Sequence, residues 1–143
     1  MMPSKSSLSR FVLLPAVLPI LAGALAACSK ADPLAAVPDM PAPWVVKLDE
    51  TYGSRDSEYL SIEGRLRGKV KTLRVVVYDV QGHPIRLNVI VAADMTQADR
   101  MFRNLAFQKQ PWSYTRKDQV LYEFAATEEA RVHIEQVRER LTR

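Results

Sequence analysis

The chain has 143 residues and a formal net charge of +4 at pH 7, with 48% hydrophobic and 25% charged residues. Its single cysteine, Cys28, excludes an internal disulfide, so a folded domain must be stabilised by its core alone. The 100 residues from Trp44 to Arg143 are within the usual size of one domain and too few for two.

The N-terminus has the features of a secretory signal. Lys5 and Arg10 form a short basic region, and a 17-residue apolar stretch follows from Phe11 to Ala27. A transmembrane helix needs about 20 apolar residues, and this shorter stretch is interrupted by Pro15, Pro19 and Gly23. An ordinary signal peptide that leaves Cys28 as a free thiol is a further alternative.

The end of the stretch, Leu25-Ala26-Ala27-Cys28, resembles the lipobox of prokaryotic membrane lipoproteins. The resemblance implies that residues 1–27 are a cleaved signal peptide. It also implies that Cys28 carries a diacylglycerol and often an N-linked acyl chain such as palmitate, which is enough for stable membrane anchoring. Because Ser29 is not aspartate, the resemblance further implies the outer membrane, with the domain facing the periplasm.

Signal removal lowers the charge. Loss of Lys5 and Arg10 from the 20 Lys and Arg residues leaves 18 against 16 Asp and Glu residues. This near balance gives little support for a nucleic-acid partner, which an exported protein would seldom meet.

Residues 28–43 are predicted to be a tether between the lipid and the domain. They contain four prolines among alanines and few charges, a composition that favours extended polyproline geometry over packing. At about 3.1 Å per residue, such a segment lets the domain of residues 44–143 stand roughly 45 Å from the bilayer.

Alternation of apolar and polar residues then predicts three strands joined by short turns, over residues 60–66, 70–80 and 85–91. Strands joined in this way form an antiparallel meander with one face exposed to water. Trp44–Leu48 is predicted to add an earlier strand, and Glu50–Glu58 to form a polar loop.

After Ala93 the spacing of the apolar residues changes from that of a strand to that of a helix. Thr96, as N-cap, begins a helix that ends before Pro111. Residues 112–118 are predicted to be a connection and Val120–Phe124 a strand. Thr127 begins a final helix with a buried stripe of apolar residues, namely Ala130, Ile134, Val137 and Leu141.

This order predicts an α+β fold. An antiparallel meander of three to four strands is followed by a helix, a strand and a C-terminal helix, with the helices packed on one sheet face.

Motifs that carry chemistry are not found. Glu129 and His133 are four residues apart, but a zinc site needs three or four ligands. His83, beside Pro84, is interpreted as a turn residue. We therefore expect no catalytic residues, no metal site and no cofactor.

Two groups of residues are candidate binding surfaces. The first is a basic cluster in a predicted hairpin, which could contact an acidic protein, anionic headgroups or cell-wall carboxylates; its members are Arg65, Arg67, Lys69, Lys71 and Arg74. A protected sheet edge is the alternative interpretation of this cluster. The second is the aromatic pair Trp112 and Tyr114, which could anchor a protein partner or close the end of the core.

The sequence thus favours a lipid-anchored envelope protein without catalytic activity that binds a protein partner, as an accessory subunit of an envelope assembly or as an inhibitor or immunity factor. The alternative is a module that binds peptidoglycan, anionic lipid or a small ligand. An enzyme whose active site forms only in three dimensions is a third hypothesis.

Overall fold

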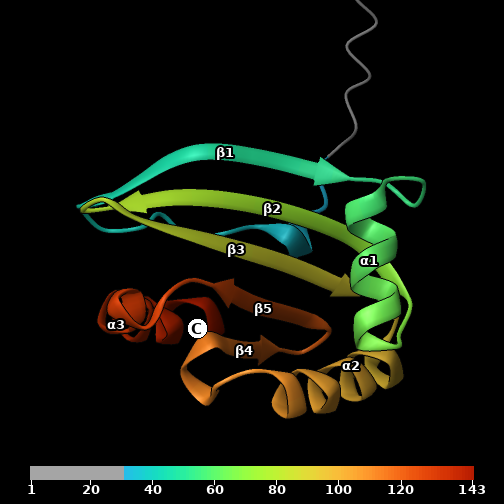
Figure 1. Cartoon of the computed structure of the whole chain (residues 1–143). Helices are drawn as coiled ribbons and strands as arrows, with labels where there is room; N and C mark the ends of the chain where they lie inside the picture. Colours follow the sequence, from blue (N-terminus) through green and yellow to red (C-terminus); the bar gives the residue numbers. More distant parts are fainter. Residues whose placement is uncertain (1–30) are drawn as a thin grey trace, which may run out of the picture.

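A computed structural model describes residues 31–143 (Figure 1). Five antiparallel strands form one sheet in the order β1-β2-β3-β5-β4, which confirms the predicted α+β class. The strands are β1 (Trp44–Tyr52), β2 (Val70–Val80), β3 (His83–Ala92), β4 (Tyr114–Lys117) and β5 (Val120–Ala125). The helices are α1 (Ser57–Leu66), α2 (Met95–Gln108) and α3 (Arg131–Thr142), with short 3-10 turns η1 (Pro33–Ala35), η2 (Pro111–Ser113) and η3 (Glu128–Ala130).

The hairpin of β2 and β3 follows from its sequence. Gln81 and Gly82, between the two strands, have positive φ angles of 54° and 82°. Two consecutive residues of this kind make a turn whose twist matches that of the flanking strands. Val80 therefore pairs directly with His83, and β3 begins two residues before the predicted start at Ile85.

Residues 57–66 form the helix α1, so the strand predicted over residues 60–66 is wrong. The buried side chains are Tyr59, Ile62 and Leu66, whose spacings of three and four residues place them on one side of a helix. Leu60, which the strand prediction placed inside, is exposed. The alternation in this segment is a coincidence that mimics a strand, and the polar loop predicted from Glu50 is shorter because β1 continues to Tyr52.

The helices cover both faces of the sheet, whereas the sequence predicted that they would share one. Leu73, Ile90 and Leu121 pack with the buried residues of α1 and α2 in one cluster, on what we call the α1/α2 face. Their neighbours along each strand point to the opposite side, the α3 face. Both sides of the central strands carry apolar residues, so each side needs a cover.

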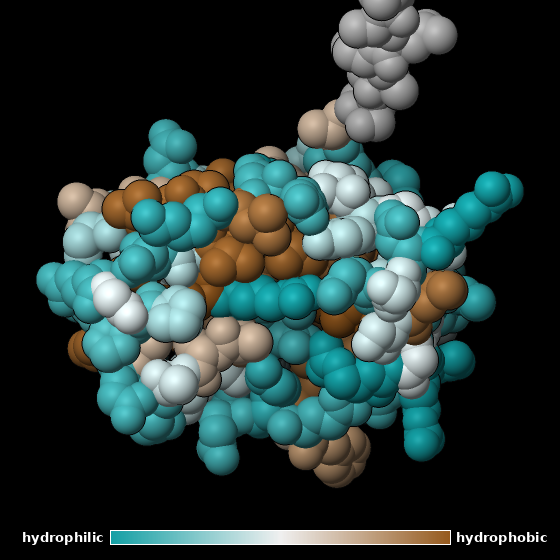
Figure 2. Space-filling view, turned by 45° about the horizontal axis from the view of Figure 1, so that its top comes forward, coloured by the Kyte–Doolittle hydropathy of each residue, from teal (hydrophilic) through white to brown (hydrophobic). Residues whose placement is uncertain are grey.

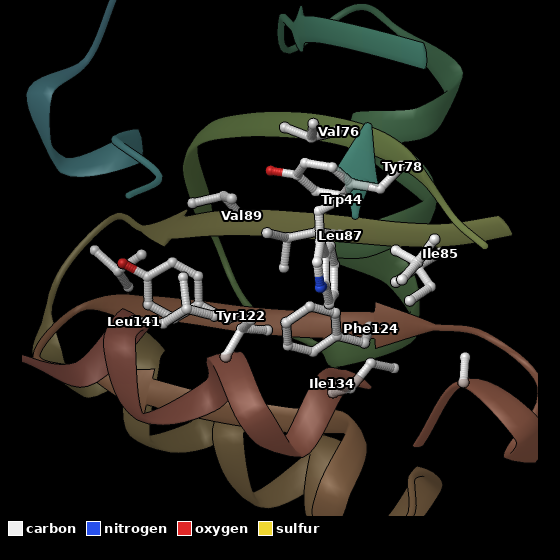
Figure 3. Packing of buried hydrophobic residues seen from close by; sticks show 14 of the residues in the cluster. Trp44, Val76, Tyr78, Ile85, Leu87, Val89, Tyr122, Phe124, Ile134 and Leu141 are labelled. Carbon is white, nitrogen blue, oxygen red and sulfur yellow. The ribbon is translucent and has the colours of Figure 1, made fainter. Parts of the chain in front are cut away.

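The core of the α3 face is the larger cluster (Figure 3). Phe124 and Leu87 share this cluster with Ile134 from α3, and Trp44 packs edge-on against Tyr78 with ring centroids 5.2 Å apart. All four residues of the predicted stripe on the final helix are buried, which confirms that prediction. Thr127 is the N-cap of the 3-10 turn η3, which begins at Glu128, and the α-helix follows at Arg131.

Two boundaries differ from prediction. The N-cap of α2 is Asp94, whose side chain accepts a hydrogen bond from the backbone N–H of Gln97 at 2.8 Å, and Thr96 lies inside the helix. The predicted connection over residues 112–118 contains the strand β4, which pairs with β5. A four-residue strand is too short to produce a clear alternation of apolar and polar residues.

Residues 31–43, here called the strap, lie on the α3 face and do not form part of a free tether. Ala35 is buried in the core of this face, and Val37 and Met40 pack against it. Arg74 donates a hydrogen bond to the carbonyl of Ala35 at 2.9 Å. The tether prediction is therefore wrong for residues 31–43, because small apolar residues between prolines can fill a shallow surface. Residues 28–30 lie outside the described part of the chain.

Candidate functional site

The structure does not bring the five residues of the predicted basic cluster together. Arg65 lies on α1, and Arg67 follows it as the C-cap of that helix with a φ angle of 52°. Lys69 is in the connection to β2, and Lys71 and Arg74 are on β2 itself. No hairpin presents them as one surface, because residues 57–66 are helical.

Four of these five cations have acidic partners. Arg74 and Asp49 are 2.7 Å apart, and Arg65 and Glu123 are 2.6 Å apart. Lys69–Glu63 and Lys71–Asp32 are looser contacts at 3.6 Å each. Their charges are thus compensated locally, which weakens the case for a collective attraction to an anionic polymer.

The pair Arg65–Glu123 belongs to a buried ionic cluster on the α1/α2 face. Glu123 on β5 is only 3% exposed, and its carboxylate also lies 3.7 Å from the ammonium of Lys109. A buried carboxylate without such partners would be very costly. The cluster therefore has a structural role in joining α1, α2 and β5.

The aromatic candidates lie on opposite sides of the sheet. Trp112 is buried in the core cluster of the α3 face. Tyr114 is half-buried on the α1/α2 face, where its ring packs edge-on against Phe102 at a centroid distance of 5.4 Å. The two residues therefore do not form a shared anchor.

The histidines approach each other without making a metal site. The ring centroids of His83 and His133 are 6.4 Å apart, with β3 contributing one ring and α3 the other. Within residues 31–143, no group of three or more His, Cys, Asp or Glu side chains is placed to hold a metal ion. Cys28, the predicted lipid attachment residue, lies outside the described residues.

A different surface emerges where α1 and α2 leave part of their sheet face uncovered. The register pairs Leu48 with Val77 and Val45 with Asp79, so these four side chains lie on the same side of the sheet. Arg86 and Pro84 continue these two rows on β3, and Ala125 continues one of them on β5. We call this surface the open face; its residues are Val45, Leu48, Val77, Asp79, Pro84, Arg86 and Ala125.

The open face has an apolar part beside a charged one. Val45 and Leu48 are 51% and 38% exposed, and Figure 2 shows apolar surface on the side of the molecule where β1 lies. Arg86 donates hydrogen bonds to Glu58 at 2.7 Å and to Asn88 at 2.9 Å. An apolar patch bordered by satisfied polar groups is typical of a protein contact surface.

The open face continues into a free sheet edge. β1 is an edge strand of nine residues whose side chains are mostly exposed, with a bulge between Val46 and Leu48. The other edge, β4, has four residues, includes Arg116 and Lys117, and is contacted by α3. Edge strands offer unpaired backbone groups to another strand, and short, charged, covered edges avoid this. β1 is longer than such edges, and no helix among residues 31–143 covers it, although Lys47 and the bulge moderate its exposure.

Sequence reasoning missed the open face. The strand prediction over Trp44–Leu48 was correct, but the number of strands and the strand order decide that β1 is an edge. One signal was present: Val45 and Val46 are adjacent in the sequence, so at least one of them must point away from the core of the α3 face.

Comparison of the chain with known protein families, with curated proteins and with solved structures finds no match. Within the described residues, no helix is both long and apolar enough to cross a membrane.

Proposed function

We propose that the chain is a lipid-anchored protein of the bacterial envelope whose domain binds a protein partner through the open face and the edge of β1. Anchoring depends on the lipobox resemblance of Leu25-Ala26-Ala27-Cys28, and the residue Ser29 favours the outer membrane with the domain in the periplasm. The domain would act as an accessory subunit of an envelope assembly or as an inhibitor or immunity factor, without catalysing a reaction.

The observation that carries the binding proposal is the exposure of Val45 and Leu48 next to a free strand edge. A partner strand added to β1 would gain main-chain hydrogen bonds, and the apolar side chains would select the partner. Burial of such residues contributes roughly 25 cal/mol per Å² of apolar area removed from water. Few of these residues are needed, because a small number of buried anchors carries most binding energy.

The alternative function, binding of peptidoglycan or another anionic polymer by the basic cluster, has lost its main support. Four of the five cations have acidic partners in the fold. The polymer would have to compete with these ion pairs. The electrostatic attraction between the basic cluster and the polymer would therefore be reduced.

Photo-crosslinking in intact cells tests the proposal. A photoreactive amino acid at Leu48 should give one discrete adduct on illumination, whose partner is identified by mass spectrometry. The same amino acid at Phe107, which is 89% exposed on α2, is the matched control and should give no such adduct.

A second variant tests whether the adduct forms through the open face. Val45→Glu places a charge beside the crosslinker on the open face and should abolish the adduct from position 48. Absence of any adduct from position 48, or equal adducts from positions 48 and 107, would contradict the proposal. An adduct of twice the chain mass would identify the partner as a second copy.

A further inference from the structure

The strap shortens the link between Cys28 and the folded domain. Asp32 is held to β2, because its carboxylate accepts a hydrogen bond from the hydroxyl of Thr72 at 2.8 Å and lies 3.6 Å from the ammonium of Lys71. Only four residue steps separate Cys28 from Asp32, and these span at most about 14 Å when fully extended. A lipid on Cys28 would therefore keep this part of the domain close to the membrane surface.

A groove lies at the same place. It runs between η1 on one side and the C-terminal end of α3 with the β4–β5 turn on the other, and its volume is about 350 Å³. Leu34, Val37, Val120, Tyr122 and Leu141 give it an apolar lining. Such a volume is at the lower end of those of ligand-binding clefts.

The rim of the groove is mainly basic. Lys117, Arg140 and Arg143 border it, together with one carboxylate, Asp118. Lys117 donates a hydrogen bond to a backbone oxygen of Arg143 at 2.6 Å, and the guanidinium of Arg143 lies 3.5 Å from Glu139. For Arg140, no ion pair within 4.0 Å is found in the part of the chain that the structure describes. The rim therefore carries positive charge that the fold itself compensates only in part.

We propose that this groove face rests on the membrane and that the groove holds an anionic phospholipid. Arg140, Arg143 and Lys117 would contact the phosphate, since basic side chains near an anionic surface are attracted to it. Leu34, which is 41% exposed, and the apolar lining would contact the glycerol and upper acyl region of the lipid. The proposal rests on the proposed lipid attachment at Cys28, which would hold the groove near the bilayer.

This docking also orients the proposed partner surface. The strap and α3 lie on one face of the sheet, whereas the open face lies on the other. With the groove face on the bilayer, Val45 and Leu48 would point away from the membrane and into the periplasm, where a partner can reach them.

The test uses the mature, lipidated chain in nanodiscs. Cys28 is the only cysteine and is consumed by lipid, so Leu34→Cys provides a unique thiol for an environment-sensitive fluorophore. Leu60→Cys, also exposed but on α1, is the matched control. In nanodiscs with phosphatidylglycerol, the label at position 34 should shift to the blue and resist quenching by aqueous iodide. The label at position 60 should do neither.

Removal of basic side chains tests whether Arg140 and Arg143 contact the lipid. Arg140→Gln with Arg143→Gln should lower the ratio of docked to free domain about 25-fold, at roughly fivefold per lost charge near an anionic surface. The protection at position 34 should then disappear. Arg100→Gln with Arg103→Gln on α2 removes the same charge elsewhere and should leave the protection unchanged.

Equal quenching of the labels at positions 34 and 60 would overturn the proposal, as would equal protection of position 34 in phosphatidylcholine and phosphatidylglycerol nanodiscs. Loss of the protection on adding millimolar glycerol 3-phosphate would also overturn it, because it would indicate a soluble anion as the ligand. Mass spectrometry of Cys28 before reconstitution separates a failure of lipidation from a failure of docking. Crosslinking at Leu48 reports on the partner surface independently.

Discussion

The guanidinium of Arg65 on α1 donates hydrogen bonds at 2.8 and 2.6 Å to the two carboxylate oxygens of Glu123 on β5, 58 positions away along the chain. Arg65→Ala would leave the buried carboxylate with only the looser contact to Lys109. We expect the free energy of unfolding to fall by about 2–3 kcal/mol, below the largest effects of broken buried pairs because Arg65 is partly exposed.

Urea denaturation of the Arg65→Ala variant at pH 7 measures this loss. Arg67→Ala is the control, because Arg67 is exposed and makes no ion pair among residues 31–143. If both substitutions changed the free energy of unfolding equally, the structural role assigned to the ionic cluster would be wrong.

Trp112 should matter for stability more than for binding, because it is buried in the core of the α3 face. Trp112→Ala should lower the free energy of unfolding by about 3–5 kcal/mol. Thermal denaturation followed by circular dichroism checks this, with Phe107→Ala, at an exposed aromatic, as the control. A wild-type melting temperature for Trp112→Ala would show that the tryptophan contributes little to the core.

Gly68 occupies a position with no space for a side chain. A Cβ atom there would lie 2.7 Å from the sulfur of Met101 and closer still to its Cγ atom. Met101 is fully buried, so its side chain has little room to move. Gly68→Ala should cost about 1–3 kcal/mol of stability, whereas Gly64→Ala, in open space, should be neutral or stabilising. Equal chemical-denaturation midpoints for the two variants would contradict this packing.

The ion pair of Asp49 and Arg74 should make part of the stability dependent on acid pH. Two hydrogen bonds from Arg74, at 2.8 and 2.7 Å, hold the pKa of Asp49 below its ordinary value of 3.8, although partial burial acts in the opposite direction. A carboxyl group whose pKa is lowered by folding stabilises the protein above its unfolded pKa. This contribution is lost as the pH falls through the folded pKa, that is, below about 3.8.

Asp49→Asn should therefore be less stable than wild type at pH 7, and the difference should shrink below pH 4. Since the side chain of Asp49 is 42% exposed, the difference at pH 7 should be no more than about 1 kcal/mol. Urea titrations at a series of pH values measure it. Asp118→Asn, at an exposed turn, is the control, and a difference that stays constant down to pH 2 would rule out this linkage.

Cys28→Ala should abolish metabolic labelling with a fatty-acid probe and prevent signal processing, because the thiol is the proposed site of the diacylglycerol. The wild-type chain should take up the probe and remain with the membrane fraction. Ser29→Ala, next to the cysteine, is the control and should still be labelled. An unmodified Cys28 in the membrane-bound mature protein would contradict lipidation.

Elements with a clear local pattern of apolar residues were predictable. The strands β2, β3 and β5 and the buried stripe of α3 follow from such patterns, because they depend only on residues near one another in the chain. Prediction failed at α1, where Ile62 and Leu66 fit the strand period together with Leu60 and the helical period together with Tyr59, and the packed structure buries Tyr59 and leaves Leu60 exposed. It also failed for the strap, where Ala35 fills a hollow that no local pattern reveals.

The sequence by itself determined the lipobox pattern at Cys28, the α+β class and most of the elements, since these depend on residues near one another in the chain. Tertiary structure decided which charges are paired, which strand is an edge and which apolar residues stay exposed. Glu123 meets Arg65, and Val45 stays exposed within residues 31–143, only because the strand order and register join distant segments. The candidate surfaces therefore changed from a basic hairpin to the open face and the groove beside the strap.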